Sequence, residues 1–356
     1  MTVTVTSAAG REARDQDLAA WLQRIPRLKN RRWRLTAASA DASFRRYLRL
    51  HHPGGTLVVM DAPPDREALG PWLDIRDRLA AAEVKVPEVY AADEMLGFAL
   101  IEDFGAHTLH AALHAGGDRD KLYAAACDTL LAMQQATATA GLAPYDESRL
   151  GAELDLFPTW FLHRHLGIEP GCDTWDQIEQ AFRLLLNAAL GQRKTFVHRD
   201  YHSRNLMVLG ETTGAVRLGV IDFQDAVLGP VTYDLVSLLK DCYVPHDNDW
   251  RQRQRTRHWQ RLDAAGLVAC RVDEFARGHE LMGVQRHLKV LGIFCRLCYR
   301  DGKTDYLQYL PHVLDMTLDG AAQEPALAEF ARWLKALCRG RDLTAQRLAG
   351  GTEGGR

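Results

Sequence analysis

Two acidic side chains and one amide stand at the ends of apolar runs, at a spacing that could hold a divalent metal ion. Asp200 lies in a polar loop after the apolar run 195–198, Asn205 follows five residues later, and Asp222 ends the apolar run 216–222. Mg²⁺ prefers oxygen ligands and is usually held by one or two carboxylates together with substrate phosphates. A further carboxylate beside such an ion can accept a proton from a hydroxyl group. These three side chains therefore have the composition that phosphoryl transfer requires.

The same residues fit a spacing that is typical of protein kinases. His198, Arg199 and Asp200 begin the pattern H-R-D-x-x-x-x-N, Asn205 completes it, and a D-F pair follows at Asp222. The residue after this pair is Gln where protein kinases have Gly, and neither an A-P-E element nor a long activation segment follows. A peptide would therefore find little platform on this chain, so we expect a small-molecule acceptor.

The chain as a whole resembles the aminoglycoside phosphotransferase-like family, whose members phosphorylate hydroxyl groups of small molecules. Within that family, several phrases are similar to the kinases that make sugar 1-phosphates from N-acetylmuramate and N-acetylglucosamine. These phrases occupy residues 41–50, 58–65, 156–166, 198–209, 223–243 and 291–303, and the resemblance spans roughly residues 15–335. It implies ATP and Mg²⁺ as cofactors, phosphorylation of the anomeric (C1) hydroxyl and a role in peptidoglycan (cell-wall) recycling.

The resemblance also implies a role for each residue of the motif. Asp200 becomes the catalytic base for the sugar hydroxyl, and Asn205 and Asp222 become the Mg²⁺ ligands. Asp234 opens an apolar helical run and resembles the buried Asp that supports the catalytic loop in kinase-like folds. It could equally be a helix N-cap. We expect His198 to support the loop, because a ring at the end of an apolar strand is usually a structural hydrogen-bonding group.

Nucleotide binding is expected from the first hundred residues of the chain. The loop 40–43 would cover the phosphates, although it lacks the glycine-rich pattern of protein kinases. The segment 102–105 would form a hinge whose backbone meets the adenine edge. The residues predicted for this site are Ser43, Phe44, Arg45, Glu102 and Phe104.

The lysine that pairs with the nucleotide phosphates in protein kinases has no evident counterpart. Met60 stands at that position, and Arg45, Arg46 or Arg49 from the preceding strand could supply the positive charge instead. Alternation along a strand places Arg45 and Arg49 on one face. Glu67 is a possible ion-pair partner, although a solvated charge on the following helix is the simpler interpretation.

The acceptor site is expected in the second half of the chain, where aromatic faces and polar groups combine as sugar sites require. The residues predicted for it are Glu153, Asp155, Trp160, Asp225, Arg296 and Arg300. Arg296 and Arg300 are four residues apart, hence on one helical face, and either could bind the lactyl carboxylate of N-acetylmuramate. Each of these six residues could instead be a core aromatic, a turn-capping carboxylate or a surface ion pair.

The periodicities predict an α+β chain with a bilobal protein-kinase-like fold. The small N-lobe, residues 1–105, would combine an antiparallel sheet with a helix around 18–25 and another around 69–79. Its strands are expected at 44–50, 56–60, 86–91 and 97–101. The larger, mainly helical C-lobe, residues 106–339, would have short strands within 195–222. Its helices are expected at 118–139, 152–166, 173–190, 233–242, 249–265, 272–299 and 305–338, and residues 340–356 are expected to be a disordered tail.

The net charge and the cysteine content limit the partners and the cellular compartment that we expect for this chain. The 356 residues carry a formal net charge of −2, which argues against nucleic acid or an anionic membrane as a partner. Seven cysteines, an odd number in a long chain, indicate reduced thiols, so we expect a cytoplasmic protein. We expect no obligate protein partner, since the sequence gives no sign of one. Two alternatives stay open at this point. One is an aminoglycoside or choline-type hydroxyl kinase, and the other is a catalytically silent, nucleotide-binding pseudokinase.

Overall fold

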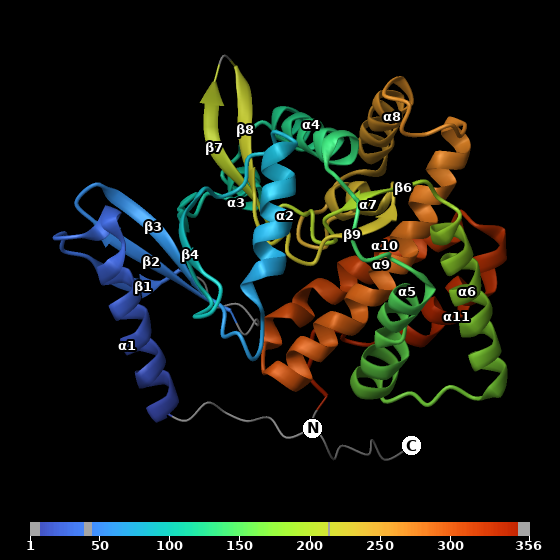
Figure 1. Cartoon of the computed structure of the whole chain (residues 1–356). Helices are drawn as coiled ribbons and strands as arrows, with labels where there is room; N and C mark the ends of the chain where they lie inside the picture. The colour runs from blue at the N-terminus through green and yellow to red at the C-terminus, as the bar shows by residue number, and fades with distance from the viewer. Residues whose placement is uncertain (1–7, 39–44, 213, 348–356) are drawn as a thin grey trace. The chain divides into compact units, whose positions relative to one another are not determined.

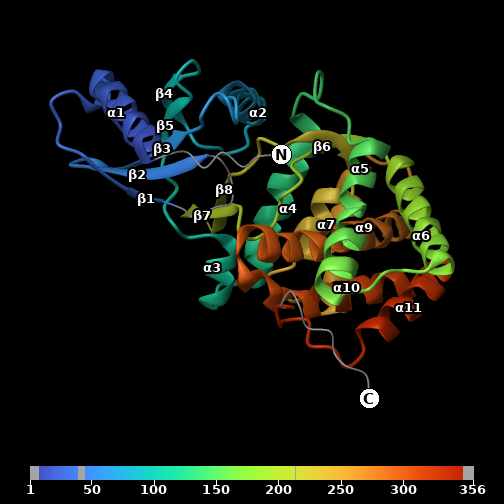
Figure 2. The same ribbon diagram turned by 90° about the horizontal axis from the view of Figure 1, so that it is seen from below.

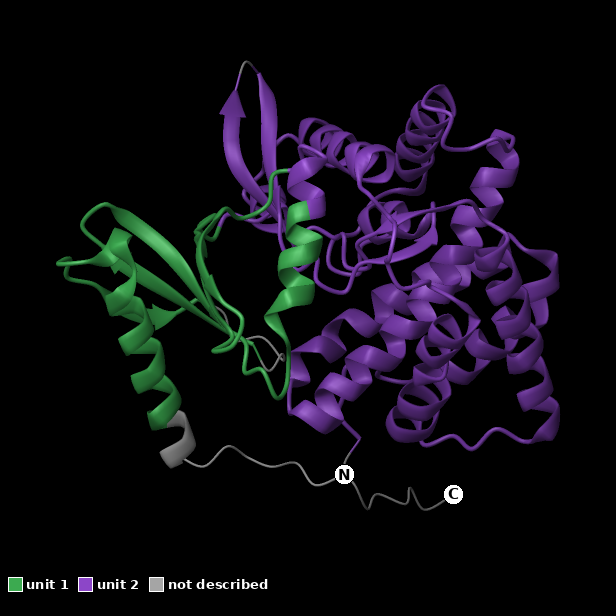
Figure 3. Cartoon of the chain, viewed as in Figure 1, with its two compact units in different colours: residues 1–77, 85–106 green, residues 78–84, 107–356 purple. Residues whose placement is uncertain are grey.

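The computed structural model describes residues 8–38, 45–212 and 214–347. The chain divides into two compact units, which Figure 3 colours separately. Unit 1 comprises residues 1–77 and 85–106, and unit 2 comprises residues 78–84 and 107–356. The last turn of one helix, residues 69–81, thus belongs to unit 2 although it lies within the predicted N-lobe. The expected α+β class is confirmed.

Unit 1 is built on a five-stranded antiparallel sheet with strand order β1-β2-β3-β5-β4 (Figure 1). The strands are β1 (Arg34–Ala37), β2 (Arg46–His52), β3 (Gly55–Asp61), β4 (Val89–Asp93) and β5 (Phe98–Glu102). Helix α1 (Ala8–Arg24) supplies Leu18 and Leu22, and the 3₁₀ turn η1 (Pro26–Leu28) supplies Leu28, to a buried cluster with Val59 and Leu100 of the sheet. Helix α2 (Leu69–Ala81) connects β3 to β4. The helix predicted around 18–25 and the strands predicted at 44–50 and 56–60 thus share one hydrophobic core.

Unit 2 is mainly helical and is organised around the 30-residue helix α9. Its helices are α3 (Leu109–His114), α4 (Arg119–Ala136), α5 (Glu147–Leu154), α6 (Cys172–Leu190), α7 (Tyr233–Leu239), α8 (Asn248–Ala264), α9 (Val272–Asp301), α10 (Leu310–Ala322) and α11 (Ala328–Cys338). Helix α10 lies along α9 in both ribbon views (Figures 1 and 2). Residues 281–295 of α9 are almost all buried, which explains why this long helix has no clear polar face there.

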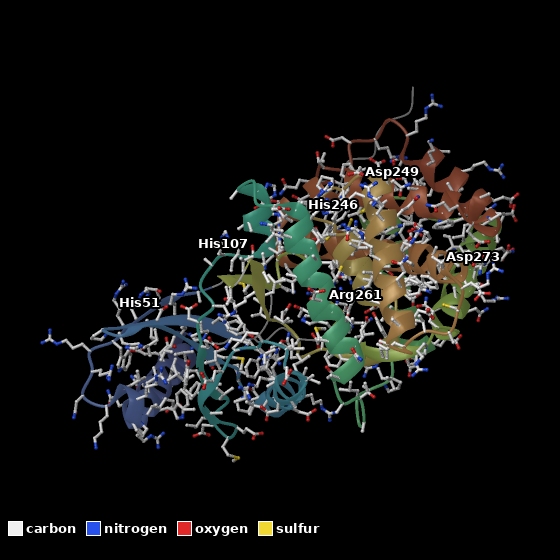
Figure 4. All side chains as sticks on the ribbon, turned by 90° about the horizontal axis from the view of Figure 1, so that it is seen from above. His51, His107, His246, Asp249, Arg261 and Asp273 are labelled. Atoms are coloured by element: carbon white, nitrogen blue, oxygen red, sulfur yellow. The ribbon has the colours of Figure 1, made fainter. Side chains whose placement is uncertain are left out.

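Shorter helical segments join the long helices of unit 2. They are the π-helix η2 (Phe157–Leu166) and the 3₁₀ segments η3 (Thr304–Tyr309) and η4 (Pro325–Leu327). Helix α8 faces α4, where Arg261 forms a 2.6 Å ion pair with Asp128 (Figure 4). This pair uses one of the five arginines of α8 within the fold.

Two small antiparallel sheets hold the loops that carry the chemical motif. Strand β6 (Lys194–Val197) pairs with β9 (Val227–Pro230), and β7 (Leu206–Thr212) pairs with β8 (Ala215–Val220). The His107 carbonyl accepts a hydrogen bond from the Val208 amide at 2.8 Å, beside β7 in Figure 4. The segment 198–205 therefore leaves one sheet and enters the other, which fixes both of its ends.

Several elements differ from the prediction. Strands β1 and β9 were not expected, and the region 305–338 contains two helices and two 3₁₀ segments rather than one helix. The predicted tail also begins too early, because Leu343 is buried and its carbonyl lies 3.0 Å from His165 Nε2. In the part of the chain that the structure describes, no helix has both the length and the apolar content needed to cross a bilayer.

Candidate active site

The backbone is strained at two residues of the motif. Arg199 has φ of +77° and Asp222 has φ of +64°, in the left-handed region that non-glycine residues rarely adopt. Among the described residues only Asn30 and Glu83 share this property. Strained conformations persist only where the surrounding structure over-determines them, and they gather at active sites. The loop 198–205, here called the catalytic loop, therefore has contacts that must hold it in place.

Asp234 and His198 provide one such set of contacts. The Asp234 carboxylate accepts hydrogen bonds from the backbone amides of His198 at 2.7 Å and Arg199 at 3.0 Å. The buried His198 ring donates from Nε2 to the Ile221 carbonyl at 3.1 Å and accepts from the Asp200 amide at Nδ1, 3.2 Å away. Burial lowers the pKa of His198 to about 4, so the ring is neutral at pH 7. These contacts give both residues the geometry of loop supports.

Asp241 supports the other end of the loop, and sequence reasoning missed it. Its buried carboxylate accepts from the amides of Ser203 at 2.9 Å and Tyr243 at 2.8 Å. The Ser203 carbonyl in turn accepts from the His110 amide at 2.9 Å. The only sequence signal is an acidic residue directly after Lys240, at the end of the apolar run of α7. The catalytic loop is thus held by two buried carboxylates.

Asp200 is partly exposed and lies in a positively charged setting. Its side chain is 40% exposed, and Arg286 Nη2 lies 3.7 Å from its Oδ1. Burial acts to raise the pKa of Asp200, but the nearby Lys289 and Arg286 outweigh it and hold the pKa below its usual value. The carboxylate is therefore ionised at pH 7 and reachable by a ligand.

A buried network of charges and tyrosines adjoins Asp200. Glu153 accepts hydrogen bonds from Lys289 Nζ at 2.7 Å, from Arg199 Nη2 at 2.6 Å and from the Tyr145 hydroxyl. The Tyr233 hydroxyl joins this network through a 3.0 Å contact with Lys289. Glu153 is buried and its oxygens bind these three groups, which is the geometry of a structural ion pair; its predicted sugar contact stays a prediction.

The predicted metal ligands lie together. Asn205 Nδ2 donates to Asp222 Oδ2 at 3.2 Å and to the Asp200 carbonyl at 3.0 Å, and Gln224 donates to Asp222 Oδ1 at 2.8 Å. Both contacts of Asn205 use its amide nitrogen, and its Oδ1 makes no hydrogen bond to another described residue. An amide oxygen beside a carboxylate matches the oxygen ligands of Mg²⁺. Groups of three or more Cys, His, Asp or Glu side chains that could bind a metal do not occur among the described residues.

The arginines predicted to supply positive charge in unit 1 have different partners. Arg45 forms a 3.1 Å ion pair with Glu67, which lies in the turn before α2 and not on that helix as predicted. Arg46 bonds the buried Asp61, and Arg49 bonds Asp103. Ser43 and Phe44 lie outside the described residues.

The predicted hinge residues are linked by a lysine. Glu102 ends β5 and accepts from Lys85 Nζ at 2.6 Å, while the same nitrogen lies 5.4 Å from the centre of the Phe104 ring. The Glu102 amide donates to the Glu88 carbonyl at 2.8 Å. Sequence reasoning did not identify Lys85, because nothing local marks it as a partner of residues further along the chain.

The remaining predicted acceptor residues are dispersed over unit 2. Asp155 and Asp225 are exposed, and Trp160 packs half-buried against the core of the helical unit. Arg300 is exposed and forms a forked pair with its neighbour Asp301, at 2.7 and 2.9 Å. The Arg296 Nε is buried without a hydrogen-bond partner in the described chain. Two causes lower the pKa of Arg296: burial, which is the larger, and the positive charge of nearby Arg300.

An aromatic cluster beside the catalytic loop was also missed. Arg204 lies over the ring of Tyr243 and donates to the Tyr309 hydroxyl at 2.7 Å. Phe294 and Tyr306 extend the cluster. Helical spacing alone marks such aromatics as core residues, so only the position of Arg204 inside the motif could have drawn attention to it.

Comparison with known proteins identifies the family. A family described as "Phosphotransferase enzyme family" matches residues 34–272. An N-acetylmuramate/N-acetylglucosamine kinase of Pseudomonas aeruginosa is 43% identical over 86% of this chain and 89% of its own length. A protein of the same name from Neisseria meningitidis is 42% identical over 83% of this chain and 87% of its own length.

Solved structures agree with this fold. A choline/ethanolamine kinase family protein from Mesorhizobium loti aligns with a TM-score of 0.57 and 15% identity, over 91% of this chain and 99% of its own. The ADP-bound aminoglycoside phosphotransferase APH(2'')-Ib aligns with a TM-score of 0.55 and 13% identity, over 85% of this chain and 97% of its own. The predicted family resemblance is confirmed, and the chain belongs to the phosphotransferase enzyme family.

Proposed function

We propose that this protein is an ATP-dependent kinase for N-acetylated amino sugars. Its acceptor would be the anomeric (C1) hydroxyl of N-acetylmuramate, N-acetylglucosamine or both, and its product a sugar 1-phosphate for peptidoglycan recycling. The observation that carries the proposal is the ionised, partly exposed Asp200 beside the Asn205–Asp222 pair. The names of the relatives support the sugar as acceptor.

Phosphoryl transfer requires the protein mainly to position the reacting groups and to stabilise charge. Asp200 would align the sugar hydroxyl and accept its proton as the phosphoryl group transfers. An anomeric hydroxyl is more acidic than an ordinary alcohol, so a carboxylate with a low pKa is basic enough when it is well positioned. Asn205 and Asp222 would hold Mg²⁺, which when bound neutralises charge on the nucleotide phosphates.

In unit 1, Arg45 would contribute positive charge toward the nucleotide phosphates. Its ion pair with Glu67 would orient the guanidinium. Arg46 and Arg49 are less suited, because each already forms short hydrogen bonds to a largely buried carboxylate. Glu102 and Phe104 would border the adenine, with the backbone of their segment offering donors and acceptors.

The charges around Asp200 disfavour the cationic acceptors of the alternative function. Arg199, Arg286 and Lys289 are among the groups that lower the pKa of Asp200, and the single carboxylate of Glu153 that bonds Arg199 and Lys289 does not balance all three cations. Choline and aminoglycosides are cations and would be repelled there. A neutral or anionic sugar fits this setting better. A pseudokinase would need neither the base nor the metal ligands, and the chain has all three.

An ADP-release assay with a panel of acceptors tests the proposal. The panel is N-acetylmuramate, N-acetylglucosamine, glucosamine, choline and kanamycin, and phosphorus NMR then locates the phosphate on the product. We expect ADP release with the two N-acetylated sugars and a phosphate on C1. Release with choline or kanamycin alone would instead establish the alternative kinase. A phosphate on another carbon would contradict the anomeric assignment.

A further inference from the structure

We infer that Arg204 binds a carboxylate on the acceptor and thereby distinguishes an anionic amino sugar from a neutral one. This inference rests on the proposed function, within which the carboxylate is the lactyl group of N-acetylmuramate. N-acetylglucosamine lacks that group. Arg204 would then set the preference between the two sugars.

The guanidinium of Arg204 is held in one orientation by two tyrosines. Its central carbon lies 3.6 Å from the centre of the Tyr243 ring and 5.3 Å from that of Tyr309. Nη2 donates a 2.7 Å hydrogen bond to the Tyr309 hydroxyl. The two rings meet edge to face at 5.1 Å, so they support one another. A guanidinium fixed in this way loses little freedom when it binds a ligand.

The absence of a carboxylate partner among the described residues distinguishes Arg204 from the other cations near the catalytic loop. Arg199 and Lys289 bond Glu153, and Arg286 lies 3.7 Å from Asp200. No carboxylate of the described chain lies within ion-pair distance of Arg204, and the side chain is partly exposed. A guanidinium has five N–H donors, and only one hydrogen bond to the described residues is formed here. The remaining donors can form the paired hydrogen bonds that carboxylates accept from Arg.

The position of Arg204 ties it to the reacting groups. It precedes Asn205 directly and follows Asp200 by four residues, in a loop whose backbone is fixed by the Asp241 carboxylate at Ser203. His202, also in this loop, packs edge-on to Tyr243 at 5.3 Å. The tyrosine rings can offer apolar surface to the C–H groups of a sugar, and the neighbouring guanidinium can offer positive charge to its carboxylate.

Arg296 and Arg300 are the rival candidates for the same role. Arg300 is engaged in its fork with Asp301, whereas Arg296 forms no ion pair with a carboxylate of the described chain. Because Arg296, like Arg204, has no such partner, the substitution of Arg296 is the control for the substitution of Arg204. It has the same side chain and a half-buried position, but it stands on α9 outside the catalytic loop.

The test measures kcat/KM of the wild type, R204Q, R204K and R296Q with three acceptors. The acceptors are N-acetylmuramate, its lactyl methyl ester and N-acetylglucosamine. Hydrogen bonds between charged groups are strong, so R204Q should lower the N-acetylmuramate to N-acetylglucosamine ratio of kcat/KM by about 10- to 100-fold. R204K, which keeps the charge without the fork, should lower it less, and R296Q should leave it unchanged.

The methyl ester separates carboxylate recognition from a general loss of activity. The wild type should prefer the acid to the ester, whereas R204Q should not discriminate between them. An unchanged sugar ratio in both R204Q and R204K, or a ratio that shifts in R296Q instead, would overturn the assignment of Arg204. If the wild type phosphorylates neither sugar, the proposed function itself fails, which is a different result.

Discussion

Replacing Glu153 by glutamine should destabilise the protein strongly, because the buried Lys289 and the partly buried Arg199 would lose their counter-charge. Lys289 and Arg199 bond this carboxylate at 2.7 and 2.6 Å, and its side chain is 10% exposed. Removing one partner of a buried ion pair costs about 3–5 kcal/mol. With a urea m-value of about 3 kcal/mol/M, the unfolding midpoint of E153Q should fall by at least about 1 M.

The pH dependence of this stabilisation has a definite sign. Burial acts to raise the pKa of Glu153, but the charges of Lys289 and Arg199 outweigh it, so the folded pKa lies below its usual value. The contribution of the Glu153 carboxylate to the free energy of unfolding is therefore fully present above its unfolded pKa of about 4.3. It is lost as the pH falls from there through the folded pKa. At pH 7 the full effect of E153Q should be measurable.

Asp155 provides the matched control, since it lies two residues away and is exposed. Urea unfolding of D155N, followed by circular dichroism, should differ from the wild type by less than about 0.5 kcal/mol. In a double-mutant cycle, E153Q combined with K289M should cost less than the sum of the two single changes. An E153Q protein as stable as the wild type, with a KM for sugar that rises, would refute this reasoning and restore the predicted sugar contact.

Three further outcomes follow from the structure. His258 and His279 are neutral in the fold, because burial lowers their pKa to about 3 and about 4. Below about pH 6.5 the unfolded chain then binds more protons than the folded one, so the free energy of unfolding should fall as the pH falls. The expected loss is up to about 1.4 kcal/mol per pH unit for each histidine. Equal urea midpoints at pH 7.5 and 5 would contradict this. Gly97 has φ of +69°, and a Cβ there would lie 1.9 Å from a backbone carbonyl, so G97A should lose more than about 2 kcal/mol in urea unfolding, whereas G151A, with open space, should not. D222A should remove the Mg²⁺ dependence of ADP binding in calorimetry, and a binding constant that still responds to Mg²⁺ would exclude Asp222 as a ligand.

Local patterns in the sequence predicted most of the fold. The hairpin of β2 and β3 and the helices α6 and α9 follow from alternation, turn residues and helical periodicity, which are properties of neighbouring residues. Strand β9 was not predicted, because four residues containing Gly and Pro form a strand only when β6, about thirty residues earlier, pairs with them. The sequence likewise predicts a tail at Leu343, because the burial of this residue depends on distant helices.

The same distinction applies to the site. The motif predicted that Asp200, Asn205 and Asp222 belong together, because their spacing along the chain reflects the strands that position them. The ion pair of Glu153 with Lys289 could not be predicted, since the two residues are 136 positions apart. Arg204 was missed for a similar reason, because Tyr309, 105 residues away, is what fixes it.

The turnover of D200N with ATP and N-acetylmuramate tests the central assignment most directly. If Asp200 is the base, kcat should fall by about 10²–10⁴ while the urea midpoint and the affinity for ADP stay close to those of the wild type. Turnover equal to that of the wild type would contradict the account.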